Sequence, residues 1–263
     1  IVPILLLQVL TSAGHVLLGD LIVRELQLSK KIRLLTAWFI ALDPSSIIYA
    51  NSIMSESLFA TLLLIAVYVI IKTVRTGEIS WLLTAAVLQA ALVYVRPIAA
   101  YFVFVVALVI VLLSNQTAMK RWMHAVAYLL LASLLAQPWI WRNESKYELS
   151  ALTSVKGYDI LYYGGGLPLA VDSSISWDEA QDQLTVELSK RISADTASIG
   201  EINAEMQSLG FEVMFDHLPT YIRVHLQGML ATLVDPGRIN LARMIYGPQA
   251  GGPGLLDAVA TRG

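Results

Sequence analysis

Cysteine is absent from this sequence of 263 residues, which excludes disulfide bonds, thiolate metal sites and cysteine nucleophiles together. Histidine is scarce as well, and the four histidines form no HExxH pattern, so no metal site can be assigned. Charged residues make up only 14% of the chain and the net charge is −2. Because nucleic-acid binding needs a basic surface, no nucleic-acid partner is expected.

Apolar residues, by contrast, make up 56% of the chain, which is above their share in soluble domains. They form long runs in residues 1–139, whereas the composition from Trp141 onward is that of a soluble protein. We therefore expect an integral membrane protein with a transmembrane helical domain at 1–139 and a water-facing region at 140–263. The chain opens inside an apolar run without the basic segment of a signal peptide, so we expect a fragment whose membrane domain is incomplete at its N-terminus.

Several of the apolar runs are shorter than the roughly 20 residues that a perpendicular membrane span needs. Short helices are nevertheless tolerated where they are buried or line a cavity. The expected fold is therefore an all-α polytopic membrane protein with about six transmembrane helices in hairpins, followed by a mostly helical extracytoplasmic region. The six segments are 1–20, 34–49, 53–71, 81–95, 97–113 and 123–139.

Basic residues between these segments predict the orientation of the chain. If every segment crosses the membrane, three basic clusters fall on one side, which the positive-inside rule makes cytoplasmic. Residues 140–263 then lie outside the cell or in a lumen, and we expect the plasma (inner) membrane. The clusters are Arg24 with Lys30, Lys31 and Arg33; Lys72 with Arg75; and Lys120 with Arg121.

The second region mixes loop and helix signals. Three glycines and a proline in 162–168 predict that this stretch forms no regular element. Ser176 and Glu179 have the spacing of a capping box that begins a helix. Apolar residues at helical spacing then predict an amphipathic helix near 211–233, bent at Pro219. This helix would lie on the bilayer or against the membrane domain.

Three polar residues near the outer ends of apolar segments are candidates for function. Glu56 is either a functional carboxylate at the membrane boundary or an acid that stabilises the start of a helix. Arg96, followed by proline, offers a planar fork that suits phosphate, or else anchors its helix end among lipid headgroups. Asp43 precedes a proline, which is ordinary turn chemistry.

Four short motifs follow one another between residues 34 and 163. They are Ala41-Leu42-Asp43-Pro44 with Ser55-Glu56-Ser57-Leu58-Phe59; Arg96-Pro97; Gln137-Pro138-Trp139-Ile140-Trp141-Arg142-Asn143; and the stretch Leu152 to Tyr162. In this order and spacing they resemble the GT-C superfamily of polytopic glycosyltransferases. The nearest branch is the protein-O-mannosyltransferase-like one, which includes the lipid A aminoarabinose transferases.

This resemblance implies an enzyme that transfers a sugar from a polyprenyl-phosphate carrier to an acceptor on the outer face of the membrane. It implies that Glu56, at the second acidic position of the family, is catalytic, and that Arg96, Arg142 and Tyr158 bind substrate. Asp43 departs from the family pattern and receives no role. The family's usual base, in an earlier outer loop, would be missing from this chain. No cofactor is certain, and a divalent metal and the acceptor (protein, lipid or glycan) stay open.

Two other functions fit the same residues. Charged side chains and short broken helices also line the pathways of transporters and flippases. A non-catalytic membrane subunit could instead use residues 140–263 to bind partners. So large an outer region on one side favours the enzyme, which should have one cleft at the outer boundary and no matching inner vestibule. We expect Glu56 and Arg96, both at outer helix ends, to border this cleft.

Overall fold

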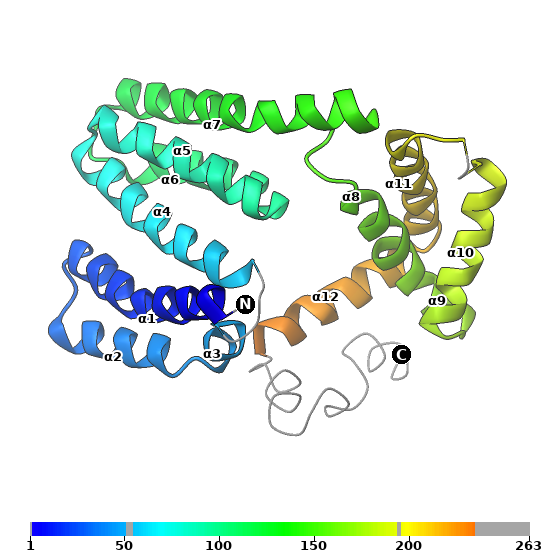
Figure 1. Cartoon of the computed structure of the whole chain (residues 1–263), viewed down its shortest axis with the longest axis horizontal. Coiled ribbons are helices and arrows are strands. Elements are labelled where there is room, and N and C mark those ends of the chain that lie inside the picture. The colour runs from blue at the N-terminus through cyan, green and yellow to red at the C-terminus, as the bar shows by residue number, and fades with distance from the viewer. Residues whose placement is uncertain (1, 51–54, 194–195, 235–263) are drawn as a thin grey trace. The chain divides into compact units, whose positions relative to one another are not determined.

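The described part of the chain, residues 2–50, 55–193 and 196–234, contains helices and no strand in this computed structural model (Figure 1). The chain divides into two compact units, Ile1–Trp139 and Ile140–Gly263. This border lies where the sequence changes from apolar to ordinary composition. The placement of the second unit outside a membrane stays a prediction.

Within the described residues, three helices are long and apolar enough to cross a membrane, namely α1, α4 and α7. The predicted all-helical membrane protein is confirmed to this extent, but six spans are not confirmed. Helix α5 and the apolar helical segment Pro97–Leu113 are shorter. The helices are α1 Val2–Glu25, α2 Lys30–Ala41, α3 Pro44–Ala50, α4 Glu56–Thr76, α5 Ile79–Val95, the 3₁₀-helix η1 Pro97–Tyr101, α6 Phe102–Leu113 and α7 Ala118–Tyr147.

The predicted segment 34–49 is not one helix, because the chain breaks between α2 and α3. The Asp43 carboxylate oxygen Oδ2 accepts hydrogen bonds from the backbone N–H of Ser46 at 2.8 Å and from its hydroxyl at 2.6 Å. Pro44, in turn, disfavours the helical conformation at the residue before it. Asp43 therefore caps the start of α3, as expected for turn chemistry.

The core of the first unit lies among α4, α5, α6 and α7, where Val69, Leu82, Val106 and Tyr128 are buried. One amide interrupts this apolar core. Gln89 of α5 donates from Nε2 to the Ala99 carbonyl oxygen of η1 at 2.6 Å, and the Tyr128 hydroxyl donates to Gln89 Oε1 at 3.1 Å. Gln89 thus links α5, η1 and α7 through hydrogen bonds inside the core, where the low dielectric strengthens them.

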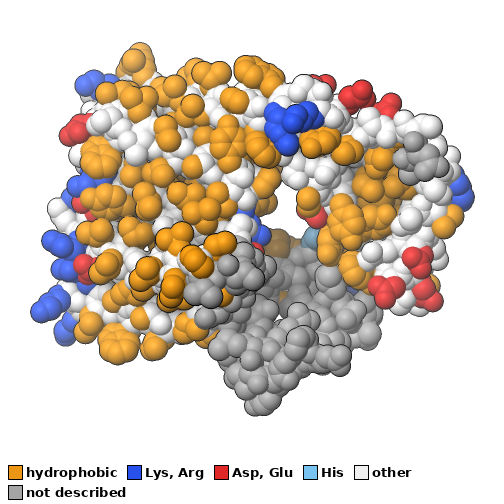
Figure 2. Space-filling model, viewed as in Figure 1, with side chains coloured by type: hydrophobic (Ala, Val, Ile, Leu, Met, Phe, Trp, Pro, Cys, Tyr) orange, Lys and Arg blue, Asp and Glu red, His pale blue; other side chains and the backbone are white. Residues whose placement is uncertain are grey.

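The basic residues gather at one end of the first unit. Glu25, at the end of α1, pairs with Lys72 at 2.8 Å and with Arg75 at 3.5 Å near the end of α4. The backbone N–H of Asn115, before α7, donates to the Val74 carbonyl at 3.1 Å. All three basic clusters therefore lie at one end, as the charge pattern predicted, and blue side chains line one edge of this unit in Figure 2. Which side of a membrane this end faces stays a prediction.

The second unit begins within α7, and its described residues, 140–193 and 196–234, form six shorter helices around an apolar core. Leu161, Tyr162, Leu184, Leu188 and Leu209 form this core. The helices are α8 Val155–Tyr158, the π-helix η2 Asp159–Gly166, α9 Leu167–Ser173, α10 Trp177–Arg191, α11 Ile199–Asp216 and α12 Leu218–Val234. The capping box predicted from Ser176 and Glu179 is confirmed at the start of α10.

The prediction that 162–168 forms no regular element is wrong, because this stretch belongs to η2 and α9. Its glycines serve close packing. A Cβ on Gly164 would lie 2.8 Å from the Met214 sulfur of α11. On the facing side of this contact, a Cβ on Gly210 of α11 would lie 2.8 Å from the backbone of Ile160 in η2. Pro168 lies in the first turn of α9. Backbone N–H groups in a first turn have no acceptor within the helix, so the lack of an N–H in proline costs no hydrogen bond there.

The amphipathic stretch 211–233 is two helices instead of one bent helix. Helix α11 ends at Asp216 and α12 begins at Leu218. Pro219 has no N–H to donate, and its ring would clash with the carbonyl four residues earlier in a continuous helix. The chain therefore breaks at His217, before the proline, where Val213 still accepts a hydrogen bond from the His217 N–H.

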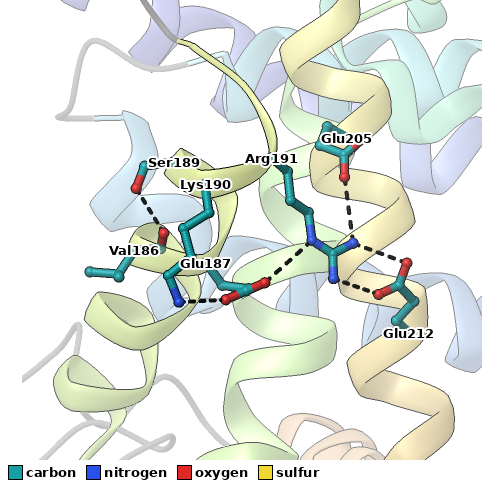
Figure 3. Close-up of polar contacts among 7 residues, drawn as sticks. All are labelled: Val186, Glu187, Ser189, Lys190, Arg191, Glu205 and Glu212. Carbon is teal, nitrogen blue, oxygen red and sulfur yellow. Dashed lines mark hydrogen bonds and ion pairs between the residues drawn. The ribbon is translucent and has the colours of Figure 1, made fainter.

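A cluster of ion pairs around Arg191 joins α10 to α11 (Figure 3). Arg191, the last residue of α10, makes two hydrogen bonds to the Glu212 carboxylate, at 3.0 and 2.8 Å. It also lies 3.5 Å from Glu205 and 3.6 Å from Glu187. The hydrogen bonds to Glu212 raise the pKa of Arg191, and Arg191 lowers the pKa of Glu212 in return. Such bidentate pairs have a defined geometry, so this cluster fixes how α10 meets α11.

Candidate functional site

Glu56 and Arg96 meet at the end of the first unit that lies opposite the basic clusters. Glu56 is the first residue of α4, and Arg96 directly follows α5. Pro97 disfavours a helical residue before it, and Arg96 accordingly has an extended backbone with φ −144° and ψ 111°. The two side chains form an ion pair, with Arg96 Nη1 donating to Glu56 Oε1 at 3.1 Å.

This ion pair leaves hydrogen-bonding groups on both sides unused. The second carboxylate oxygen of Glu56, Oε2, is buried and accepts no hydrogen bond from the described residues. Among the described residues the Arg96 guanidinium makes one hydrogen bond, through Nη1, although it has five N–H donors. The Arg96 side chain is 41% exposed and that of Glu56 is 20% exposed. A ligand with an anionic group could therefore bind the exposed side of Arg96, and its hydroxyl or amine could reach Oε2 once the atoms that cover this oxygen move aside.

Aromatic rings flank the pair. The Arg96 guanidinium carbon lies 5.9 Å from the centre of the Phe59 ring, within the range of a cation–π contact. Phe59 in turn packs against Phe102, with ring centres 6.4 Å apart. The pair is thus held against an apolar wall formed by α4 and the start of α6.

An apolar groove of about 360 Å³ runs among α4, α5 and α6. Phe102, which contacts Phe59, belongs to its lining, and Leu63 lies one turn beyond Phe59 along α4. Gln89 is the polar residue of this lining. The groove therefore begins beside Phe102, whose ring packs on Phe59 next to Arg96. The sequence alone did not predict this groove. A signal existed in Gln89, an amide in the middle of an apolar run.

The other two predicted site residues, Arg142 and Tyr158, lie in the second unit. Arg142 donates from Nη1 to Asn143 Oδ1 at 2.9 Å, and its guanidinium lies 5.4 Å from the Tyr147 ring centre. Tyr158 packs on Tyr162 with ring centres 4.7 Å apart. Their substrate-binding role stays a prediction.

A second polar cluster connects α9 to the start of α12. Asp172 accepts a hydrogen bond from the Thr220 hydroxyl at 2.6 Å and lies 2.7 Å from His217 Nδ1. The Thr220 and His217 contacts lower the pKa of Asp172. Within the described residues, no group of three or more histidine, aspartate and glutamate side chains is placed to hold a metal ion. The cluster joins α9 to the start of α12.

Comparison of this chain with protein-family models, with curated proteins and with solved structures found no match. The resemblance to GT-C glycosyltransferases accordingly rests on the short motifs between residues 34 and 163.

Proposed function

We propose that this chain acts in a membrane glycosyltransferase that moves a sugar from a polyprenyl-phosphate carrier to an acceptor on the outer face of the membrane. The observation that carries the proposal is the Glu56–Arg96 pair. It combines a cation with unused donors and a buried carboxylate with an unused acceptor oxygen at one helix boundary. The motif resemblance, in which these two residues occupy functional positions, supports the same reaction.

Arg96 suits the phosphate of the donor. When the bond between the sugar and the phosphate oxygen breaks, negative charge develops on the leaving phosphate. A guanidinium already fixed nearby stabilises this charge more strongly in the transition state than in the ground state. The planar fork of Arg96 can hold two phosphate oxygens, and its exposed side is open to such a group.

Glu56 suits the acceptor. A hydroxyl or amine that attacks the sugar loses a proton, and a carboxylate can accept that proton or orient the attacking atom. The unused Oε2 atom offers the required acceptor, while Oε1 stays with Arg96. Glu56 would thus act alone or assist another base.

The groove among α4, α5 and α6 supports a lipid donor. Its lining is apolar apart from Gln89, and it begins near the aromatic rings that contact Arg96. A polyprenyl chain is apolar along its length, so it can fill such a groove while its phosphate reaches Arg96. The reacting bond would then lie at the helix boundary, where an acceptor on the outer face has access.

The proposal is tested on the full-length protein in lipid nanodiscs, with an undecaprenyl-phosphate-linked sugar as donor. Arg96→Ala should raise the KM for the donor, and Arg96→Lys should restore only part of the loss because an ammonium lacks the bidentate fork. Glu56→Gln should lower kcat by about 10²- to 10⁴-fold, the usual range for loss of an acid–base group. Lys120→Ala, which removes a cation from the basic end, is the control and should leave the donor KM unchanged.

A charge-swapped variant separates catalysis from a structural ion pair. Glu56→Arg combined with Arg96→Glu retains both charges in reversed positions, so it should recover thermal stability relative to Arg96→Ala without recovering transfer. Recovery of transfer in the swapped protein, or wild-type transfer in Glu56→Gln and Arg96→Ala, would show that the pair only holds α4 to α5. Movement of intact donor across the bilayer without sugar transfer would identify a flippase instead.

A further inference from the structure

Helix α12 exposes a continuous row of apolar side chains. Five of them are between 39% and 65% exposed. They follow one another at steps of four, four, three and one residues, which places them along one stripe of a helix. We call these five residues the apolar face of α12: Leu218, Ile222, Leu226, Met229 and Leu230. Orange side chains in Figure 2 show how common exposed apolar groups are on the visible side of this protein.

The opposite side of α12 packs within the second unit. Val224 is 3% exposed, and α12 contacts α9, where Asp172 binds both Thr220 and His217. A third side is polar, since Arg223 and Gln227 are both exposed. The helix therefore has a packed side, a polar side and the apolar face between them, which is the pattern of a helix that lies in a membrane interface.

The chain itself connects the second unit to a lipid surface. Helix α7 can cross a membrane and continues without interruption from the first unit into the second, as far as Tyr147. Trp139 and Trp141 stand near the border between the units, and tryptophan is enriched where helices leave the hydrocarbon. The second unit therefore starts at a membrane surface. Arg223, next to the apolar face, has the charge that attracts phosphate headgroups.

We propose that α12 lies in the membrane interface, with its apolar face among the acyl chains and Arg223 at the headgroups. This inference does not depend on the proposed transferase activity. It assigns the second unit two attachments to the bilayer, α7 and α12, so that the unit is held at the surface in a fixed orientation. Exposed apolar patches of this kind on soluble surfaces mark interaction sites, and here the partner is lipid.

The absence of cysteine permits a direct test on the full chain in nanodiscs. Met229→Cys and Gln227→Cys each introduce one labelling site, two residues apart and on different sides of α12. After labelling with the fluorophore NBD, position 229 should lose fluorescence to lipids that carry a doxyl quencher in the acyl chain, and should resist aqueous iodide. Position 227 should show the reverse.

Two results would overturn the proposal. Quenching of both positions by iodide, with no effect of doxyl lipid, would mean that the apolar face is in water. Protection of position 229 from both quenchers would mean that protein covers the face. As a second readout, Arg223→Gln should weaken the doxyl quenching at position 229 more in nanodiscs with anionic lipid than in those with only zwitterionic lipid. Equal effects in the two lipids would exclude the headgroup contact of Arg223.

Discussion

Replacement of Gly210 by alanine tests how closely η2 approaches α11. A Cβ at this position would lie 2.8 Å from the Ile160 carbonyl carbon and from its oxygen. These are backbone atoms, so no side-chain rotation can relieve the overlap, and the two helices must move apart. Gly228→Ala provides the matched control, because a Cβ at Gly228 meets no atom within 4 Å. Both glycines lie inside helices.

The expected difference follows from two opposing effects. Alanine favours a helix over glycine by about 1 kcal/mol in both variants, so this gain cancels in the comparison. Overpacking of a well-filled contact costs about 1–3 kcal/mol, and it applies to Gly210→Ala alone. The free energy of local unfolding of α11 should therefore be lower in Gly210→Ala by up to about 2 kcal/mol net, whereas Gly228→Ala should stabilise α12 by up to about 1 kcal/mol.

Hydrogen exchange of the full chain in detergent measures both effects in place. Amides of 199–216 should exchange about tenfold faster in Gly210→Ala for each 1.4 kcal/mol lost. In Gly228→Ala the amides of α11 should be unchanged and those of α12 slower. Slower exchange of α11 in Gly210→Ala, to the same extent as that of α12 in Gly228→Ala, would show that the overlap costs nothing; it would refute the close approach and the explanation for the glycines in η2.

Single cysteines at Lys31 and Lys120 should react with a membrane-impermeant reagent from one side of the bilayer, and a cysteine at Leu42 should react from the other. Reaction of all three from one side would contradict the placement of the basic clusters at one end of the first unit. Gln89→Leu leaves a buried tyrosine hydroxyl and a backbone carbonyl without this partner and should lower stability by about 1–3 kcal/mol in thermal unfolding, so wild-type stability would disprove its role in the core. Asp172 has a lowered pKa when folded, so its stabilising contacts are present above its unfolded pKa of about 3.9 and are lost as the pH falls through the lower folded value. Exchange at the start of α12 should then accelerate in acid, and in Asp172→Asn this acid-dependent step should disappear.

The sequence alone predicted those features of the structure that depend on residues close together in the chain. Long apolar runs predict helices in a membrane because every backbone polar group must be satisfied within the segment. The border near residue 139 is visible because composition changes there, and the spacing of Ser176 and Glu179 identifies a helix start that needs only neighbouring residues. Asp43 before a proline likewise predicted the local contact that caps α3.

Other features depend on partners that are distant along the chain, and the sequence gives no rule for finding them. Glu56 and Arg96 were expected at outer helix ends that border one cleft, but only the packing of α4 beside α5 makes them an ion pair across 40 residues. The glycines of η2 predict a loop by local propensity, yet the close approach of α11 makes them helical residues that fill a narrow contact. Conformational preference along the chain is worth about 1 kcal/mol per residue, and tertiary packing in a contact of this kind outweighs it.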